Sequence, residues 1–180
     1  VHTPTVVLGF QEWFVRERAA IPVDAVAYEG IEQARTAPGV LEAIAAADLV
    51  VLGPSNPVAS ILPILALPGV RESVAAQRCV AVTPTVAGVP ITDEGECRRA
   101  ASRAAMLASM GVAHRASAVA ALYAELIDAF VVDDADADEV EVIREALPGI
   151  DVLCAGTVIG DEATGDTLAA HLLAWTESTG

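Results

Sequence analysis

The segment best suited to chemistry joins an apolar run to the start of a helix. Residues 53–57 read Gly-Pro-Ser-Asn-Pro, and either Ser55 or Asn56 is expected to cap the helix that follows. The N–H groups of residues 58–59 would then face outward at the positive end of the helix, next to the Ser60 hydroxyl. Such a group of donors can bind a phosphate or another anion without a lysine. The alternative is an ordinary capped turn that binds no ligand.

A second candidate is the aromatic and charged segment at residues 10–18. Its alternation predicts a strand with Gln11 and Trp13 on one face and Glu12 and Phe14 on the other. Aromatic rings here can stack on a flat ligand, and the Glu12 carboxylate can coordinate a cation or orient a hydroxyl. The alternative is an edge hairpin whose aromatic side chains anchor it to the core.

These segments must be positioned by a framework in which apolar runs alternate with alanine-rich helical stretches. We expect strands at 5–8, 12–18, 23–28, 49–52, 79–82, 129–132 and 152–155. We expect helices at 38–46, from 57, after 69, and at 96–110, 117–127, 138–147 and 166–175. This alternation predicts right-handed βαβ units, a mostly parallel sheet and a single α/β domain over residues 1–180.

Three strand ends are candidate binding positions. In open α/β sheets, ligands bind beyond the carboxyl ends of the strands, at the point where the strand order reverses. The ends concerned are residues 53–56, residues 83–85 (Thr-Pro-Thr) and residues 133–134 (Asp-Asp). The acidic run from Asp133 to Glu141 is interpreted as a solvated strand-to-helix loop rather than an ion site.

The charge composition excludes several classes of function. The 180 residues carry 25 acidic and 10 basic side chains, for a formal net charge of -15, and every basic one is an arginine. A chain this acidic has no general electrostatic footprint for DNA, RNA or an anionic membrane surface. No apolar run reaches the roughly 20 residues of a membrane span. The three cysteines lack zinc-site or disulfide spacing, which indicates a reducing, cytoplasmic location.

In order and spacing, three segments resemble the 2-phospho-L-lactate transferase family, which acts in the biosynthesis of the deazaflavin coenzyme F-420. They are residues 10–16 (Phe-Gln-Glu-Trp-Phe-Val-Arg), residues 37–40 (Ala-Pro-Gly-Val) and residues 53–71, which begin with the Gly-Pro-Ser-Asn-Pro block. Looser agreement continues through residues 80–84, 110–112, 118–123 and 130–133. The resemblance therefore covers most of the chain.

The resemblance implies a Rossmann-like α/β fold, with a mostly parallel sheet flanked by helices in three layers. It implies transfer of a 2-phospholactyl or phosphoenolpyruvyl group from a guanosine diphosphate-linked donor to the deazaflavin alcohol FO. The products would be GMP and the first coenzyme F-420 intermediate, with Mg²⁺ assisting. Catalysis of this kind depends mainly on positioning and on neutralising charge.

The same resemblance assigns residues by matching motif. Gln11 and Glu12 would be catalytic, in the cleft near the transferred group. Ser55, Asn56 and Ser60 would lie by the nucleotide diphosphate. The full set of binding residues implied in this way is Phe10, Gly53, Pro54, Ser55, Asn56, Ser60, Thr83 and Pro84.

Members of that family begin with a glycine-rich strand–loop–helix and acidic metal-site residues, which nothing in these 180 residues matches. We therefore expect the C-terminal part of a longer transferase, inactive alone, with the ligands of Mg²⁺ outside this chain. A homodimer is one option for its assembly. Two alternatives remain: a non-catalytic nucleotide-sugar-binding regulator of the same fold, and an anion-binding α/β module completed by a partner chain.

Overall fold

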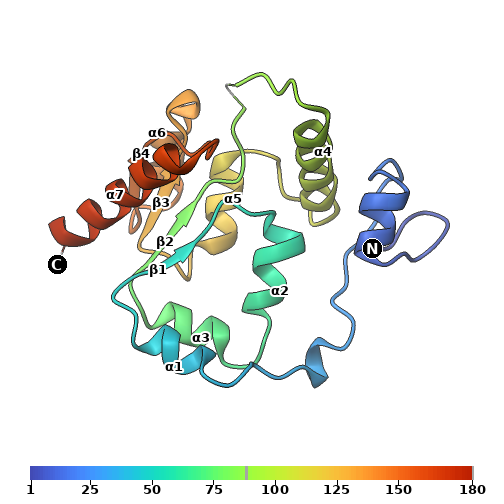
Figure 1. The fold of residues 1–180 in the computed structure, drawn as a ribbon, viewed down its shortest axis with the longest axis horizontal. Coiled ribbons are helices and arrows are strands. Elements are labelled where there is room, and N and C mark those ends of the chain that lie inside the picture. The colour runs from blue at the N-terminus through green and yellow to red at the C-terminus, as the bar shows by residue number, and fades with distance from the viewer. Residues whose placement is uncertain (88, 180) are drawn as a thin grey trace.

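The computed structural model describes residues 1–87 and 89–179, with a four-stranded parallel sheet at its centre (Figure 1). The strands are β1 (Val50–Leu52), β2 (Cys79–Val82), β3 (Ala129–Val132) and β4 (Asp151–Cys154). The α-helices are α1 (Val40–Ala45), α2 (Leu62–Leu65), α3 (Val70–Ala75), α4 (Glu94–Ser109), α5 (Ala116–Tyr123), α6 (Glu139–Ala146) and α7 (Glu162–Ser178). Two π-helical turns, η1 (Glu12–Arg16) and η3 (Pro57–Ile61), and two 3₁₀ turns, η2 (Ile31–Gln33) and η4 (Asp134–Asp136), complete the elements.

The register of the sheet follows directly from the apolar runs. Val50 lies beside Cys79, and Val80 lies beside Ala129, which in turn lies beside Asp151. A helix connects each strand to the next, so the predicted mostly parallel sheet is confirmed. The described strands lie in chain order, β1-β2-β3-β4, without a reversal. The expectation that a reversal of strand order marks the ligand site is therefore not met in this part of the chain.

Two cores lie on opposite faces of the sheet, which gives the three predicted layers. All residues of β2 and β3 are buried, as expected for the middle strands of a parallel sheet. Cys79 and Ala81 point into the larger core, and Val80 and Val82 point into the smaller one. Helices α3, α4, α5 and α6 contribute to the larger core through Val70, Val74, Met106, Leu107, Val119, Ala120 and Ile143. The smaller core is closed by α7.

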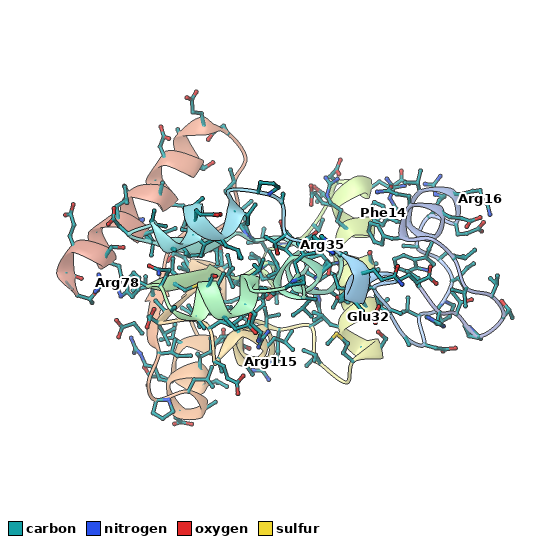
Figure 2. All side chains as sticks on the ribbon, turned by 90° about the horizontal axis from the view of Figure 1, so that it is seen from below. Phe14, Arg16, Glu32, Arg35, Arg78 and Arg115 are labelled. Carbon is teal, nitrogen blue, oxygen red and sulfur yellow. The ribbon has the colours of Figure 1, made fainter. Side chains whose placement is uncertain are left out.

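The end of α7 is attached to the sheet by polar contacts as well as by packing. The Trp175 indole N–H donates to Asp151 Oδ2 at 2.9 Å, and the Arg78 guanidinium lies 5.8 Å from the Trp175 ring centroid. Arg78 also donates to the carbonyls of Thr176 and Thr179 at 2.7 and 2.9 Å, at the negative end of the helix. Figure 2 shows Arg78 at the side of the molecule where α7 lies. Among the described residues, no helix is both long and apolar enough to cross a bilayer.

The N-terminal segment forms helical turns and isolated bridges where strands were expected. The strand predicted at 12–18 is wrong, because residues 12–16 form η1. In place of the strands at 5–8 and 23–28, the backbone makes single antiparallel bridges from His2 to Val7 and to Ala25. Helical geometry explains the aromatic run as well as alternation does, since Phe10 stacks on Phe14 four residues later, with ring centroids 5.5 Å apart. The fully buried Trp13 then donates its indole N–H to the Ile21 carbonyl at 2.8 Å.

The acidic run at residues 133–141 is not the solvated loop that was expected. Asp133, Asp136 and Glu139 are buried and hydrogen-bonded. The 3₁₀ turn η4 and the start of α6 direct every third residue inward, whereas Asp134 and Asp138 between them stay exposed. The run therefore ties neighbouring loops to the end of β3.

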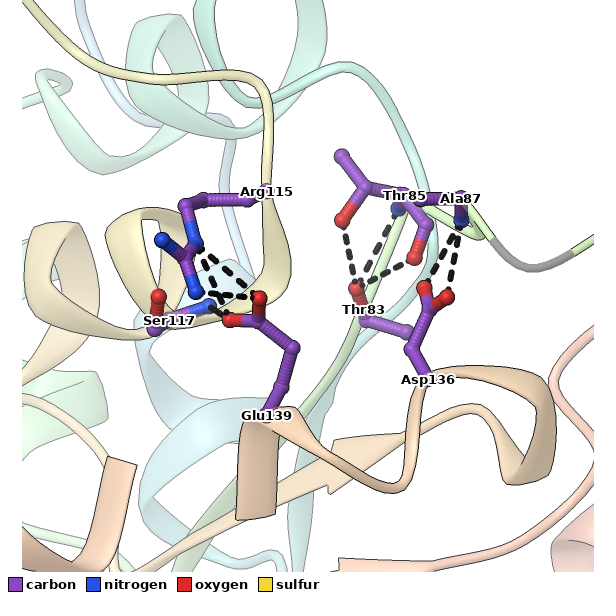
Figure 3. Close-up of polar contacts among 7 residues, drawn as sticks. All are labelled: Thr83, Thr85, Ala87, Arg115, Ser117, Asp136 and Glu139. Carbon is purple, nitrogen blue, oxygen red and sulfur yellow. Dashed lines mark hydrogen bonds and ion pairs between the residues drawn. The ribbon is translucent and has the colours of Figure 1, made fainter. Parts of the chain in front are cut away.

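Each buried carboxylate holds a different segment, and Figure 3 shows the contacts of Asp136 and Glu139. Asp136 accepts hydrogen bonds from the Ala87 N–H at 2.8 and 3.1 Å, and so anchors the loop that leads from β2 to α4. Glu139 forms an ion pair of 2.6 Å with Arg115 and accepts from the Ser117 N–H at 3.0 Å, which anchors the start of α5. Asp133 accepts from the N–H and hydroxyl of Thr157, at 2.7 and 2.8 Å, beyond β4.

The hydrogen-bond partners of the Asp133 carboxylate are all donors. Burial acts to raise the pKa of this carboxyl, but hydrogen bonds from Ala135, Thr157 and Val158 outweigh burial and lower it. The ionised group therefore contributes stability above the pKa of an unfolded aspartate, about 3.9, and this stability is lost as the pH falls through the lower folded pKa. Replacing one oxygen by an NH₂ group should cost about 1–3 kcal/mol at pH 7, since an amide cannot accept from all these donors.

Urea unfolding of Asp133→Asn, followed by tryptophan fluorescence, measures this loss at pH 7 and again at acid pH. The loss should shrink as the pH falls below 4. The matched control is Asp138→Asn, because Asp138 is exposed and its side chain makes no capping hydrogen bond. Equal stability of the two variants at pH 7 would contradict the assigned role of Asp133.

Candidate functional site

Two adjoining cavities lie between the N-terminal segment, the turn after β1 and α4. The first, which we call the arginine cleft, has a volume of about 410 Å³ and the second, the apolar cavity, about 420 Å³. The arginine cleft is lined by Phe10, Phe14, Pro54, Ser55, Asn56, Ala59, Ser60, Glu96, Arg99, Ser102 and Arg103. The apolar cavity is lined by residues 1–2, 7–10 and 26–29 together with Val58, Ala59, Pro63 and Met106. Phe10 and Ala59 belong to both walls.

A residue of the turn after β1 caps the helix that follows, so the backbone donors expected to be free are already bonded. Asn56 is the cap, and its Oδ1 accepts from the N–H groups of Val58 and Ala59 at 3.0 and 3.2 Å. The Ser60 N–H donates to the Asn56 carbonyl at 2.9 Å. The helix start therefore has no outward-facing amides at residues 58–59, and the expectation that these two groups are free to face a ligand is wrong. The side chains of Ser55, Asn56 and Ser60 are what this turn presents to the cleft.

The positive charge of the cleft comes from α4, which the motif analysis did not single out. Arg99 and Arg103 lie one turn apart on that helix, and both line the cleft. Arg99 is paired with Glu96, which also lines the cleft. A signal for these residues was present in the sequence, since an acidic chain without lysine places Arg98, Arg99 and Arg103 within six consecutive residues.

Arg103 is held in place by a neutral histidine. Its Nε donates to His114 Nε2 at 3.0 Å. Burial, and then the charge of Arg103, lowers the pKa of His114, so that its ring is neutral and can accept at pH 7. Burial also lowers the pKa of Arg103, yet a guanidinium remains protonated at neutral pH. The terminal nitrogens of Arg103 make no hydrogen bond to any described residue and so remain available to an anion in the cleft.

The aromatic wall of the cleft belongs to the N-terminal segment and is fastened to α4. The Arg98 guanidinium lies 5.6 Å from the Phe14 ring centroid, and Arg18 pairs with Glu94. Figure 2 shows Phe14 at the boundary between this segment and α4, with Arg16 on the outer side of the molecule. Both π-helical turns of the described chain, η1 and η3, border the cleft. π-Helical turns are rare and occur frequently at functional sites.

The structure brings together some of the predicted site residues and separates others. Phe10, Pro54, Ser55, Asn56 and Ser60 meet in the arginine cleft. The remaining predicted residues, Gln11, Glu12, Gly53, Thr83 and Pro84, line neither cavity. Their assigned roles stay predictions.

Two of these separated residues have partners of their own. The Glu12 carboxylate pairs with Arg16, four residues along η1. The Thr83 hydroxyl is buried and lies 3.0 Å from the Thr85 hydroxyl (Figure 3). Both groups are therefore already engaged within the chain.

The carboxylates of this chain do not fit a Mg²⁺ site. Within residues 1–87 and 89–179, no group of three or more His, Cys, Asp or Glu side chains could hold a metal ion. Glu96 at the cleft is paired with Arg99, and the buried Asp133 and Glu139 are hydrogen-bonded to donors of the protein. No residue described here is therefore assigned to the metal.

Comparisons with known proteins give a consistent result. The family model described as 2-phospho-L-lactate transferase CofD matches residues 3–152. The chain is 46% identical over 134 residues to a phosphoenolpyruvate transferase of Thermobifida fusca, covering 74% of this chain and 39% of the relative. It is 47% identical over 138 residues to a phosphoenolpyruvate transferase of Streptomyces coelicolor, covering 76% and 41%. The chain thus spans about two fifths of the length of these relatives.

Among solved structures, protein BH3568 of Bacillus halodurans matches with a TM-score of 0.46 and 20% sequence identity, covering 77% of this chain and 47% of that one.

The cleft predicts that Arg103 binds small phosphate-containing anions. In Arg103→Gln the affinity for pyrophosphate should fall at least tenfold, because a hydrogen bond to a charged group contributes about 1.5–3 kcal/mol. Isothermal titration calorimetry with pyrophosphate measures the change. The control is Arg35→Gln, which makes the same change of net charge at an exposed residue outside both cavities. An equal loss in both variants would show that net charge, and not the cleft, governs binding.

Proposed function

The chain belongs to the 2-phospho-L-lactate transferase CofD family, and from this membership we propose that it is part of an enzyme that transfers a phosphoenolpyruvyl or 2-phospholactyl group in coenzyme F-420 biosynthesis. The relatives named phosphoenolpyruvate transferase favour the phosphoenolpyruvyl group. The donor would be a guanosine diphosphate derivative and the acceptor the deazaflavin alcohol FO.

The proposed reaction is a displacement at phosphorus. The terminal hydroxyl oxygen of FO forms a bond to the phosphorus that carries the enolpyruvyl or lactyl group. The bond from that phosphorus to the oxygen shared with the second phosphate breaks, and GMP leaves with this oxygen and its electron pair. The hydroxyl proton is released to solvent. The product is a phosphodiester between FO and the transferred group, so no oxidant or reductant is needed.

The observation that carries the proposal is the arginine cleft in an otherwise strongly acidic chain. The formal net charge is -15, yet five of the ten arginines lie at residues 16–18 and 98–103, on the two segments that meet at the cleft. A donor of this kind bears negative charge on its diphosphate and its carboxylate. Arginine binds both groups through paired N–H donors, so the cleft is where we place the anionic end of the donor.

The chain contributes positioning and charge neutralisation in this proposal. Arg103, and Arg99 once released from Glu96, would compensate the charge that develops on the leaving phosphate. The hydroxyls of Ser55 and Ser60 would fix the orientation of the phosphates. Mg²⁺, when bound by residues outside this chain, would neutralise further charge on the diphosphate. Because the chain spans about two fifths of its relatives, we propose that it binds these ligands but does not turn over alone.

Asn56 provides a test of the donor site that preserves the fold. Asn56→Asp keeps an oxygen that can cap residues 58–59, but it adds a negative charge to the cleft. The affinity for GDP should therefore fall by about tenfold or more, with little change in thermal stability. Asn56→Ala is the contrasting variant, because losing the cap should cost about 1 kcal/mol of stability.

Calorimetric titration with GDP and thermal unfolding measure the two effects separately. Unchanged GDP affinity in Asn56→Asp would remove Asn56 from the donor site. Release of GMP from FO and the donor by the 180-residue chain alone would contradict the expectation that it needs the rest of the transferase.

A further inference from the structure

The two arginines that line the arginine cleft are in different states. Arg103 donates through Nε to His114, and its two terminal nitrogens make no hydrogen bond to any described residue. Arg99 instead donates through Nε, at 3.0 Å, and through Nη2 to one carboxylate oxygen of Glu96. One guanidinium therefore has paired donors available, whereas the paired donors of the other already hold an anion that belongs to the protein.

Glu96 belongs to the wall of the cleft itself. Its side chain lines the same cavity as both arginines. It precedes Arg99 by three residues on α4, so the two side chains are neighbours on one face of this helix. The Glu96 carboxylate thus occupies the edge of the Arg99 guanidinium that a phosphate group would bind.

The Glu96 carboxylate carries its negative charge at neutral pH. The hydrogen bond from Arg99 lowers the pKa of Glu96, and the charge of Arg103 acts in the same direction. Arg99 and Arg103 are four residues apart on α4, and like charges at that spacing repel each other. Glu96 therefore compensates part of the positive charge of α4 as long as the cleft holds no anion.

The pair of Glu96 with Arg99 is exposed enough to be broken at small cost. The side chains of Arg99 and Glu96 are 57% and 54% exposed. Ion pairs of this kind contribute little, because water competes for both partners. Phosphate groups carry more negative charge and more acceptor oxygens than a carboxylate, and an anion already held by Arg103 acts on Arg99 at high local concentration. Such an anion is therefore able to replace Glu96.

We infer that Glu96 is an exchangeable counter-ion of the arginine cleft: it occupies Arg99 while the cleft is empty, and an anion with two phosphate groups displaces it after binding to Arg103. Arg103 is then the first contact of the anion and Arg99 the second. When the anion leaves, Glu96 returns to Arg99, and this competition favours release. The inference rests on the proposed function for the use of the cleft as an anion site, but it concerns how the protein controls access to one of the two arginines.

A double-mutant cycle on Glu96 and Arg99 tests the exchange, with the affinity for pyrophosphate measured by isothermal titration calorimetry at pH 7. Glu96→Gln should bind pyrophosphate about three- to fivefold more tightly, because Arg99 no longer has to be released. Arg99→Gln alone should lose about threefold or less, because the competing pair is lost together with the contact. In the Glu96→Gln background, the same Arg99→Gln change should cost about tenfold.

The cycle contains its own control for charge. Glu96→Gln removes one negative charge in both backgrounds, but it removes a competitor only where Arg99 is present. In the Arg99→Gln background, Glu96→Gln should therefore change the affinity by about twofold or less, since an exposed charge is screened by salt. Circular dichroism and thermal unfolding of all variants show whether the fold is retained.

The outcomes separate the exchange from the proposed function. Non-additive changes of the stated pattern support the exchange. Equal effects of Glu96→Gln in both backgrounds overturn it, because Glu96 would then act through its charge alone. A loss of affinity in a folded Glu96→Gln variant also overturns it, because Glu96 would then position Arg99 for the anion instead of competing for it. Both of these results leave the proposed function intact.

Two further results concern the cleft as a whole. If Arg103→Gln binds pyrophosphate as tightly as the unmodified chain, or if the unmodified chain and Glu96→Gln both fail to bind it, the exchange and the donor site in this cleft are overturned together. If the cycle is non-additive but the chain does not bind GDP, the exchange stands and the assignment of a guanosine diphosphate donor falls.

Discussion

The cap that the Asn56 side chain places at the start of η3 is the interaction that organises the turn between the two cavities. The side-chain oxygen accepts from two backbone N–H groups at the start of η3, and the side-chain nitrogen lies against the Met106 sulfur of α4. The first contact fixes the path of the chain after β1, and the second is a weak contact between that turn and α4. The residues that follow this cap, together with α4, line both the arginine cleft and the apolar cavity.

This cap also decides how the protein can bind an anion. A helix start with free amides would bind phosphate through its backbone, but here those donors are satisfied internally. Side chains must therefore supply the positive charge, and Arg99 and Arg103 are placed to do so. In a chain with a net charge of -15, two of the ten arginines line this one cleft, and one of them is paired with Glu96. The neutral His114 ring holds the second of them in place.

Polar side chains at the ends of the strands anchor the loops that border the site. Asp136 anchors the loop that enters α4, and Glu139 with Arg115 anchors the start of α5. A buried carboxylate is tolerated only where donors surround it, and each of these groups has them. Thr83 and Asp133 likewise form internal contacts at the carboxyl edge of the sheet. These polar residues at strand ends thus form contacts that hold the fold together in this part of the chain.

The sequence by itself determined the α/β class, the parallel sheet and the family, because buried apolar runs and the Gly-Pro-Ser-Asn-Pro block are local patterns. Residues close together in the chain, such as Ser55, Asn56 and Ser60, were also predicted as one site and do line one cleft. Alternation over the short segment at 10–18 could not separate a strand from a helical turn, because Phe10 and Phe14 are also neighbours at helical spacing.

Only the tertiary structure decided which residues lie opposite one another. It placed the arginines of α4 opposite the turn after β1, buried every third residue of an acidic run, and formed a cavity from segments as distant as residues 7–10 and Met106. The physical reason is that hydrogen-bond satisfaction and burial depend on groups far apart in the chain, which local spacing does not specify.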